Sequence, residues 1–298
     1  MNRLSLASLP ALPASVRSPN TRSVSGVGIV HFGPGAFHRA HQAAYIDDLL
    51  THDPRWGIAA VSMRTRGTID ALAEQDGLYT LVIRDADPSL RVIGAHRRFL
   101  GPEDAAETRA LLADPAVALV TTTVTEKGYC LAADGTLDMT HPDIVHDLAG
   151  TRVPRSVVGW LIAGLAARRT AGVAPFVPMP CDNLASNGAK LHAALVAFAG
   201  RKDASLADWI AGEVRVPSTM VDIYHAGERH RALRRCRRNA RRRGSGGRFS
   251  VNHLPTGSSR TSDALSAPIS PASARPSPTT SAAMRRPSCG SSTARIPR

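Results

Sequence analysis

VGIVHFGPGAFHRAHQAAYIDDLL, residues 27–50, is the stretch from which the rest of the chain is interpreted. It begins with an apolar run, Val27–Phe32, short enough for a buried parallel strand. A glycine turn at residues 33–36 follows, and the pattern after it predicts a helix. The helix positions expected to face a core are Ala40, Ala43, Ala44 and Ile46. A strand, a glycine turn and a helix in this order receive a dinucleotide pyrophosphate, because glycines let main-chain N–H groups approach the phosphates and the helix N-terminus favours negative charge.

The glycine spacing alone is ambiguous. The pattern G-x-G-x-x-G would need a glycine where His38 stands, and a tight connection between any strand and helix can contain Gly-x-Gly. The next residues, Phe37–Gln42, read F-H-R-A-H-Q. The combined run G-x-G-x-F-H-R-A-H-Q after an apolar strand resembles the start of the mannitol dehydrogenase and fructuronate reductase family. That family consists of long-chain, polyol-specific, NAD-dependent dehydrogenases.

Three later runs resemble further parts of the same family and occur in the family's order. They are T-V-T-E-K-G-Y-C at residues 123–130, C-D-N-L-A-S-N-G at 181–188 and P-S-T-M-V-D at 217–222. The resemblance therefore covers residues 27–222. It implies an α/β fold with a Rossmann-type doubly wound sheet over residues 25–222, preceded by a flexible segment, residues 1–24.

The remaining secondary structure is predicted from pattern and length. The expected strands are Gly57–Ser62, Leu78–Ile83, Leu90–Gly94, Val117–Thr122 and Phe176–Met179. The expected helices are Glu103–Leu112, a short one starting near His141, Val157–Thr170, and Gly188–Ala199 with Asn187 as its N-cap.

The cofactor site follows from these placements and from the resemblance. The residues expected to bind it are Gly33, Gly35, Ala36, Phe37, His38, Arg64, Thr125 and Glu126. In a Rossmann unit the second strand ends at an acid that binds the adenosine ribose, and here the residues at that point read M-R-T-R. Arginines can hold a 2′-phosphate, so the sequence is compatible with NADP as well as with NAD. Solvated loop charges are the alternative interpretation of these arginines.

The resemblance also assigns substrate residues. Lys127 belongs to the form of the second run found in sugar-acid reductases, where a basic residue meets a substrate carboxylate; a Glu-Lys pair at a strand end is otherwise an ordinary surface pair. Asn183 would donate its amide to the substrate oxygen that gains negative charge. Asp222 would lie beside the catalytic lysine as a supporting residue.

The composition excludes several classes of protein. The chain has 298 residues, enough for two domains, and 43% of them are apolar. No apolar run approaches the roughly 18 residues of a membrane span, and residues 1–24 lack the pattern of a signal peptide. The four cysteines have no C-x-x-C spacing, which indicates reduced thiols and a cytoplasmic location. The pair His38-x-x-His41 has no evident third ligand, so we expect no metal.

The net charge of +13 comes from the last quarter of the chain. Residues 223–298 contain sixteen arginines, no lysine and two acidic residues, a net of +14, while residues 1–222 carry −1. This basic segment is rich in Ser, Pro and Thr and predicts a disordered tail in place of the family's helical C-terminal domain. Only two aromatic residues accompany its arginines, so binding of nucleic acid is disfavoured.

Translation out of frame is the explanation of this tail that we favour. If each new codon takes the third base of one residue and the first two bases of the next, residues 251–261 permit Glu-Pro-Phe-x-x-Trp-Val-Ile-Glu-Asp. Residues 287–297 permit Lys-Leu-Arg-Leu-Val-Asn-Gly-Ser-His-Ser in the same way. Both resemble family segments that follow P-S-T-M-V-D, and the second contains the family's Lys-x4-Asn-x2-His motif.

The missing motif changes the expected function. In the family the lysine is the general acid/base, the asparagine polarises the reacting oxygen and the histidine assists orientation. The sequence therefore predicts an NAD-dependent oxidoreductase that interconverts a ketone and a secondary alcohol on a linear sugar acid of the fructuronate or tagaturonate/mannonate type, inactive as given. The alternatives are a mannitol 2-dehydrogenase, a non-catalytic NAD-binding remnant, and a basic nucleic-acid-binding protein.

Overall fold

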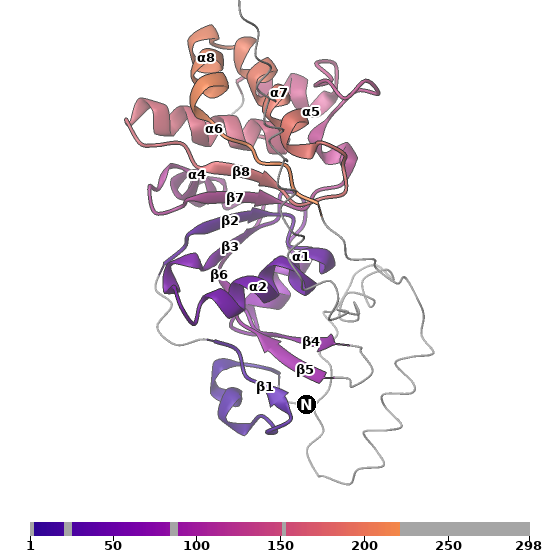
Figure 1. The fold of residues 1–298 in the computed structure, drawn as a ribbon, viewed down its shortest axis with the longest axis vertical. Coiled ribbons are helices and arrows are strands. Elements are labelled where there is room, and N and C mark those ends of the chain that lie inside the picture. Colours follow the sequence, from indigo (N-terminus) through magenta and orange to yellow (C-terminus); the bar gives the residue numbers. More distant parts are fainter. Residues whose placement is uncertain (1–2, 21–25, 84–88, 151–152, 221–298) are drawn as a thin grey trace, which may run out of the picture.

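The computed structural model describes residues 3–20, 26–83, 89–150 and 153–220. Within these ranges a five-stranded parallel sheet forms the centre of the molecule (Figure 1). Its strands are β2 (Ile29–Phe32), β3 (Ile58–Val61), β6 (His96–Leu100), β7 (Leu119–Thr122) and β8 (Val177–Pro180). Their spatial order is β6-β3-β2-β7-β8, and every neighbouring pair is parallel.

This strand order is that of a Rossmann-type sheet. The chain starts in the middle with β2, adds β3 and β6 on one side, and then adds β7 and β8 on the other. The direction of growth reverses between β2 and β7, and ligands of open parallel sheets bind at such a reversal, beyond the carboxyl ends of the strands. The predicted fold class is confirmed for the described residues.

Helices cover both faces of the sheet (Figure 1). The bounds are α1 (Ala36–Ala40), α2 (Gln42–Leu49), α3 (Gly67–Ala73), α4 (Ala105–Ala113), α5 (Pro142–Leu148), α6 (Val157–Thr170), α7 (Asn187–Gly200) and α8 (Ala204–Glu213). Because side chains alternate along a strand, β2 contributes Ile29 to the core beneath α2 and Val30 and Phe32 to the core beneath α6. The sheet is thus buried on both faces, as its apolar strands predict.

The helix predicted after the glycine turn is two helices. Its backbone breaks at His41, where φ is −116° and ψ is −88°, between α1 and α2. Ala40, Ala43 and Ala44 are buried, and Ile46 is partly buried against the same core, as predicted.

A smaller sheet lies beside the first. It has the order β1-β5-β4, with bounds β1 (Val16–Arg17), β4 (Tyr79–Ile83) and β5 (Ser89–Ile93). β5 is antiparallel to β4 and parallel to β1. β1 and the 3-10 helix η1 (Leu6–Ala11) lie within residues 1–24, the segment expected to be flexible, so the small sheet includes part of that segment.

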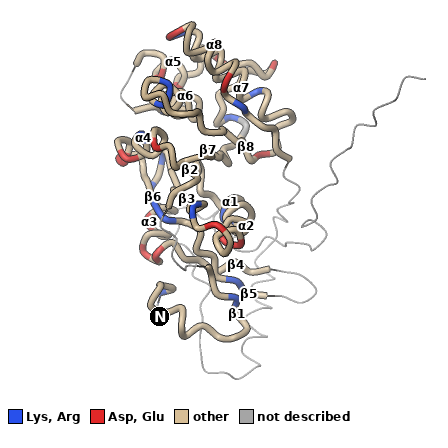
Figure 2. The backbone as a smooth tube through the Cα atoms, turned by 60° about the vertical axis from the view of Figure 1, so that its left-hand side comes forward, with Lys and Arg blue, Asp and Glu red and all other residues tan. Residues whose placement is uncertain are grey.

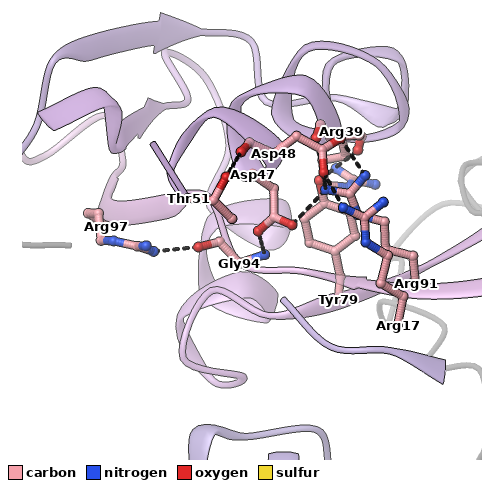
Figure 3. Close-up of polar contacts among 10 residues, drawn as sticks. Arg17, Arg39, Asp47, Asp48, Thr51, Tyr79, Arg91, Gly94 and Arg97 are labelled. Carbon is pink, nitrogen blue, oxygen red and sulfur yellow. Dashed lines mark hydrogen bonds and ion pairs between the residues drawn. The ribbon is translucent and has the colours of Figure 1, made fainter. Parts of the chain in front are cut away.

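A buried ion pair joins the small sheet to α2 (Figure 3). Arg91 of β5 donates to the carboxylate of Asp47 at 2.7 Å and to that of Asp48 at 2.8 Å. Asp47 also accepts the main-chain N–H of Gly94 at 2.9 Å, so both oxygens of its buried carboxylate have donors, whereas Arg91 Nε has no acceptor among the described residues. Removing Arg91 would leave the buried Asp47 carboxylate without its counter-charge, whereas removing Asp47 would leave Arg91 still paired with Asp48.

Charges of both signs are interspersed along the described chain (Figure 2). No helix among the described residues has the length and apolarity needed to cross a membrane. The basic tail predicted at residues 223–298 lies outside the described residues, and so does Asp222.

Candidate cofactor site

The glycine turn lies at the carboxyl end of β2, at the point where strand order reverses. Gly33 has φ +90°, and a Cβ there would lie 2.8 Å from the carbonyl oxygen of Thr123. Only glycine fits this position without strain. Gly35 differs, because a Cβ there would meet, among the described residues, only the carbonyl oxygen of Gly33, at 3.8 Å. The described part of the protein therefore leaves space at Gly35.

The loop after β7 borders the same crevice. Strands β2 and β7 are neighbours in register, so residues 33–36 and 123–125 follow parallel strands that end side by side. Thr123 Oγ1 donates to the carbonyl of Gly33 at 2.6 Å and joins the two loops. Thr125 is exposed at this edge, and Lys127 is exposed in the following 3-10 helix η3 (Glu126–Tyr129). The structure brings these predicted residues together; the side chain of Glu126 is outside the described part.

Ala36 and Phe37 open α1 directly above the turn, with Gly35 as the N-cap residue. The N-terminus of α1 therefore lies at the same end of the sheet as the two loops, and the N-terminal end of a helix carries partial positive charge.

His38 lies beneath the turn. Its side chain is 0% exposed, with Nε2 at 3.0 Å from His96 Nε2 and Nδ1 at 3.0 Å from Gln42 Oε1. Its ring stacks on that of His31, with ring centroids 3.5 Å apart. The imidazole of His38 is therefore inside the protein and not in the crevice to which the sequence prediction assigned it.

Burial keeps these imidazoles neutral. Desolvation lowers the pKa of His31 to about 3 and that of His96 to about 3. It also lowers the pKa of His38 well below its usual range, and His31 and His96 act in the same direction because each would repel a second positive charge.

Arg64 follows the carboxyl end of β3, one strand away from the glycine turn. Its side chain is 76% exposed and lies 3.3 Å from the carboxylate of Asp143. A cavity of about 310 Å³ adjoins it, lined by Val61, Met63, Arg64, Pro102, Asp143, Val153, Pro154, Arg155 and Trp160. Arg64, the glycine turn and Thr125 thus follow three adjacent parallel strands along one edge of the sheet.

The loop after β8 completes this edge. Asn183 is exposed there, and the neighbouring Asp182 accepts a hydrogen bond from the Tyr129 hydroxyl at 2.5 Å. The prediction that Asn187 caps α7 is wrong: Ser186 is the N-cap residue, and Asn187 Oδ1 accepts the N–H of Thr219 at 3.0 Å. Asn187 instead fixes the P-S-T run against the loop after β8.

One group of side chains has metal-binding chemistry. The ligand atoms of Cys130, His141 and Asp143 lie within 4.8 Å of one another. Asp143 already pairs with Arg64, and His141 Nδ1 accepts the N–H of Asp143 as the cap of α5. Both groups therefore have partners within the protein.

Sequence reasoning missed two residues of this site, His31 and Thr123. His31 is 0% exposed, with Nδ1 at 2.8 Å from Thr121 Oγ1 and Nε2 at 2.9 Å from Thr123 Oγ1. The available signal was a polar residue inside an apolar strand, since a buried imidazole needs hydrogen-bond partners.

A parallel sheet of this order, with a glycine turn at its reversal point, defines a Rossmann-type dinucleotide-binding domain. The chain belongs to the mannitol dehydrogenase family, because the sequence profile described as the mannitol dehydrogenase Rossmann domain matches residues 27–228.

Two curated relatives and one solved structure illustrate the similarity. The chain is 45% identical to the mannitol 2-dehydrogenase of Cereibacter sphaeroides and 43% identical to the D-mannonate oxidoreductase of Escherichia coli K12, each match covering 65% of this chain and 42% of the relative. The structure of Pseudomonas fluorescens mannitol 2-dehydrogenase in ternary complex with NAD and D-mannitol matches with a TM-score of 0.71 and 40% identity, over 75% of this chain and 47% of that chain. This chain thus spans less than half the length of these relatives.

Proposed function

We propose that this chain binds a nicotinamide dinucleotide along the carboxyl edge of its parallel sheet, as an oxidoreductase of the mannitol dehydrogenase family. The observation that carries the proposal is the open glycine turn at the reversal point between β2 and β7. The cofactor would supply the hydride acceptor or donor. The protein would hold its pyrophosphate at Gly33, Gly35, Ala36 and Phe37, and Thr125 and Glu126 would border the nicotinamide half.

The adenosine half would occupy the cavity beside Arg64. This position follows the carboxyl end of β3, where NAD-binding units carry an acid for the ribose hydroxyls. Arg64 and Arg155 both line the cavity, and a guanidinium group is suited to a 2′-phosphate. We propose NAD as the cofactor. NADP is the alternative, because the two arginines could bind its 2′-phosphate.

The substrate that we propose is a linear sugar acid of the fructuronate or tagaturonate/mannonate type. Lys127 supports a carboxylate-bearing substrate, because its exposed ammonium lies at the end of β7 beside the proposed nicotinamide position. Asn183, exposed in the loop after β8, would donate to the reacting oxygen. The similarity to a D-mannonate oxidoreductase agrees with this choice. A mannitol 2-dehydrogenase activity is the second candidate, favoured by the similarity to enzymes of that name.

We propose that this chain binds the cofactor but does not catalyse the reaction. Its three lysines are Lys127, Lys190 and Lys202, and none lies in the family's Lys-x4-Asn-x2-His motif. General acid/base catalysis contributes about 10²–10⁴ in rate, and one donor to the reacting oxygen about 10²–10³. A frameshift near codon 223 would account for the missing motif and for the truncated family match. Resequencing the gene from the codon for Pro217 onward tests this, since an unchanged reading frame would refute it.

Gly35→Val tests cofactor binding. Valine at this position contacts little of the protein, so the thermal midpoint should change by less than about 2 °C. The added methyl groups would occupy the proposed phosphate site and weaken NADH binding at least about tenfold. Gly212→Val is the matched control, because Gly212 is exposed and no atom of the described residues lies within 4 Å of an added Cβ there. Titration of NADH fluorescence measures both variants, and unchanged binding by Gly35→Val would refute the site.

A further inference from the structure

A chain of polar side chains in close contact runs through the protein beneath the glycine turn. Its members are Thr123, His31, Thr121, Gln42, His38 and His96, and successive polar atoms lie between 2.8 and 3.3 Å apart. Five of them are buried, and Thr123, at the crevice end, is partly buried. The proposed cofactor binding makes no direct use of these side chains.

The chain ends on the carbonyl group of Gly33. Thr123 Oγ1 donates to this carbonyl at 2.6 Å, and His31 Nε2 lies 2.9 Å from the same hydroxyl and 3.2 Å from the carbonyl. Since the hydroxyl proton is directed to Gly33, the imidazole N–H is the donor to the hydroxyl oxygen. His31 thereby fixes the rotation of Thr123, and Thr123 fixes the carbonyl.

The second carbonyl of the turn is held in a similar way. Arg39, which is buried, donates from Nη1 to the carbonyl of Pro34 at 2.7 Å. Figure 3 shows the neighbouring contact in which Tyr79 donates to the main-chain oxygen of Arg39, at 2.6 Å. Both turn carbonyls therefore accept hydrogen bonds from side chains, and the Gly33 carbonyl also accepts the N–H of Gly35 at 2.6 Å. These bonds fix both carbonyl groups.

We propose that His31 and Thr123 are positioning residues for the phosphate groups of the dinucleotide. They fix the Gly33 carbonyl and tie the loop after β2 to the loop after β7, so the phosphate site is ordered before the ligand arrives. The inference rests on the proposed function, because it assumes that a dinucleotide pyrophosphate binds at this turn. Pre-organisation of this kind lowers the cost of ordering a loop on binding.

Thr123→Val is the decisive variant. Valine has nearly the shape of threonine but lacks the hydroxyl, so it removes the hydrogen bond from Thr123 to Gly33 and leaves only the longer contact, at 3.2 Å, of His31 Nε2 with the Gly33 carbonyl. We expect the dissociation constant for NADH to rise about tenfold, measured by fluorescence titration at a temperature where circular dichroism shows each variant to be fully folded. Thr123→Ser restores the hydroxyl and should bring the constant to within about threefold of that of the unsubstituted protein.

Thr108→Val is the matched control. Thr108 is a buried threonine of α4, and its hydroxyl has no hydrogen-bond partner among the described residues. Thr108→Val should bind NADH with an unchanged dissociation constant. The control thereby shows that weaker binding comes from losing the Thr123 hydroxyl and not from replacing any threonine by valine. If Thr123→Val fails to fold, Thr123→Ala replaces it in the same comparison with Thr123→Ser.

The outcomes distinguish the two proposals. If the unsubstituted protein binds NADH and Thr123→Val binds it equally well, the positioning role is refuted and the cofactor site stands. The same conclusion follows if Thr123→Ser is as weak as Thr123→Val. If the unsubstituted protein does not bind NADH, the proposed function fails, and the positioning role fails with it.

Discussion

Acid should destabilise this protein strongly, through the buried imidazoles beneath the glycine turn. His31, His38 and His96 are each fully buried, and the pKa of each is lowered in the folded state, to about 3 for His31 and His96. In the unfolded chain a histidine titrates near its ordinary value of about 6.5. The cationic side chains near the cluster, Arg39 and Arg97, act in the same direction, because each repels a protonated imidazole.

The sign follows from which state binds protons. Below pH 6.5 the unfolded chain takes up protons that the folded protein does not accept until about pH 3. The stability contributed by the neutral imidazoles is therefore fully present above pH 6.5 and is lost as the pH falls toward 3. Each group adds a slope of about 1.4 kcal/mol per pH unit inside this window. Between pH 7 and 5 that amounts to about 2 kcal/mol per histidine, or about 4 kcal/mol for His31 and His96 together, and His38 acts in the same direction. This loss approaches the whole stability of a marginally stable domain.

Urea denaturation followed by circular dichroism at pH 7, 6, 5.5 and 5 measures this slope. His31→Gln should reduce the slope by about 1.4 kcal/mol per pH unit, whatever it does to stability at pH 7. His52→Gln, at an exposed position, is the matched control variant. A free energy of unfolding that stays constant from pH 7 to 5 would show that the imidazoles are hydrated or protonated, and would refute the reasoning.

Two further predictions concern the elements that hold the edge strands of the site. Arg168 is buried and donates to four main-chain carbonyl groups. Arg168→Met should therefore lower the free energy of unfolding by about 3 kcal/mol and the thermal midpoint by about 6–12 °C. Arg169→Met, at the more exposed neighbouring position, should change the thermal midpoint little. Gly188→Ala would place a Cβ 2.5 Å from the main chain of Pro217 and should detach the P-S-T run. Faster amide hydrogen exchange after residue 217 would show this detachment. Gly200→Ala makes an ordinary contact at 3.8 Å and should leave the exchange rates unchanged.

Patterns that depend on local sequence predicted the fold well. The helix expected at Val157–Thr170 has those bounds in the structure, because a capping serine precedes a long apolar stretch and arginines end it. The strand of β2 was equally clear, since a strand buried on both faces must be almost entirely apolar.

The elements that the sequence did not reveal depend on distant partners. β6 reads H-R-R-F-L, and its middle residues are not buried, so no apolar pattern marks it. It forms because β3 offers a free edge. β1 has two residues and pairs with β5, more than seventy positions later. Asn187 was misassigned for the same reason: its partner Thr219 is brought to it by the fold and not by local sequence.

Several side chains of the family motif lie inside the protein, next to the candidate site, and not on its surface. Of the run G-x-G-x-F-H-R-A-H-Q, the side chains of His38, Arg39 and Gln42 all lie inside, bonded to His96, to the carbonyl of Pro34 and to His38, respectively. Fixing the carbonyls of this turn needs side-chain donors at defined positions, and this requirement is more specific than a second glycine. The side chains that make the run recognisable are therefore those that hold the turn, while the position left open for a ligand, Gly35, has no side chain at all.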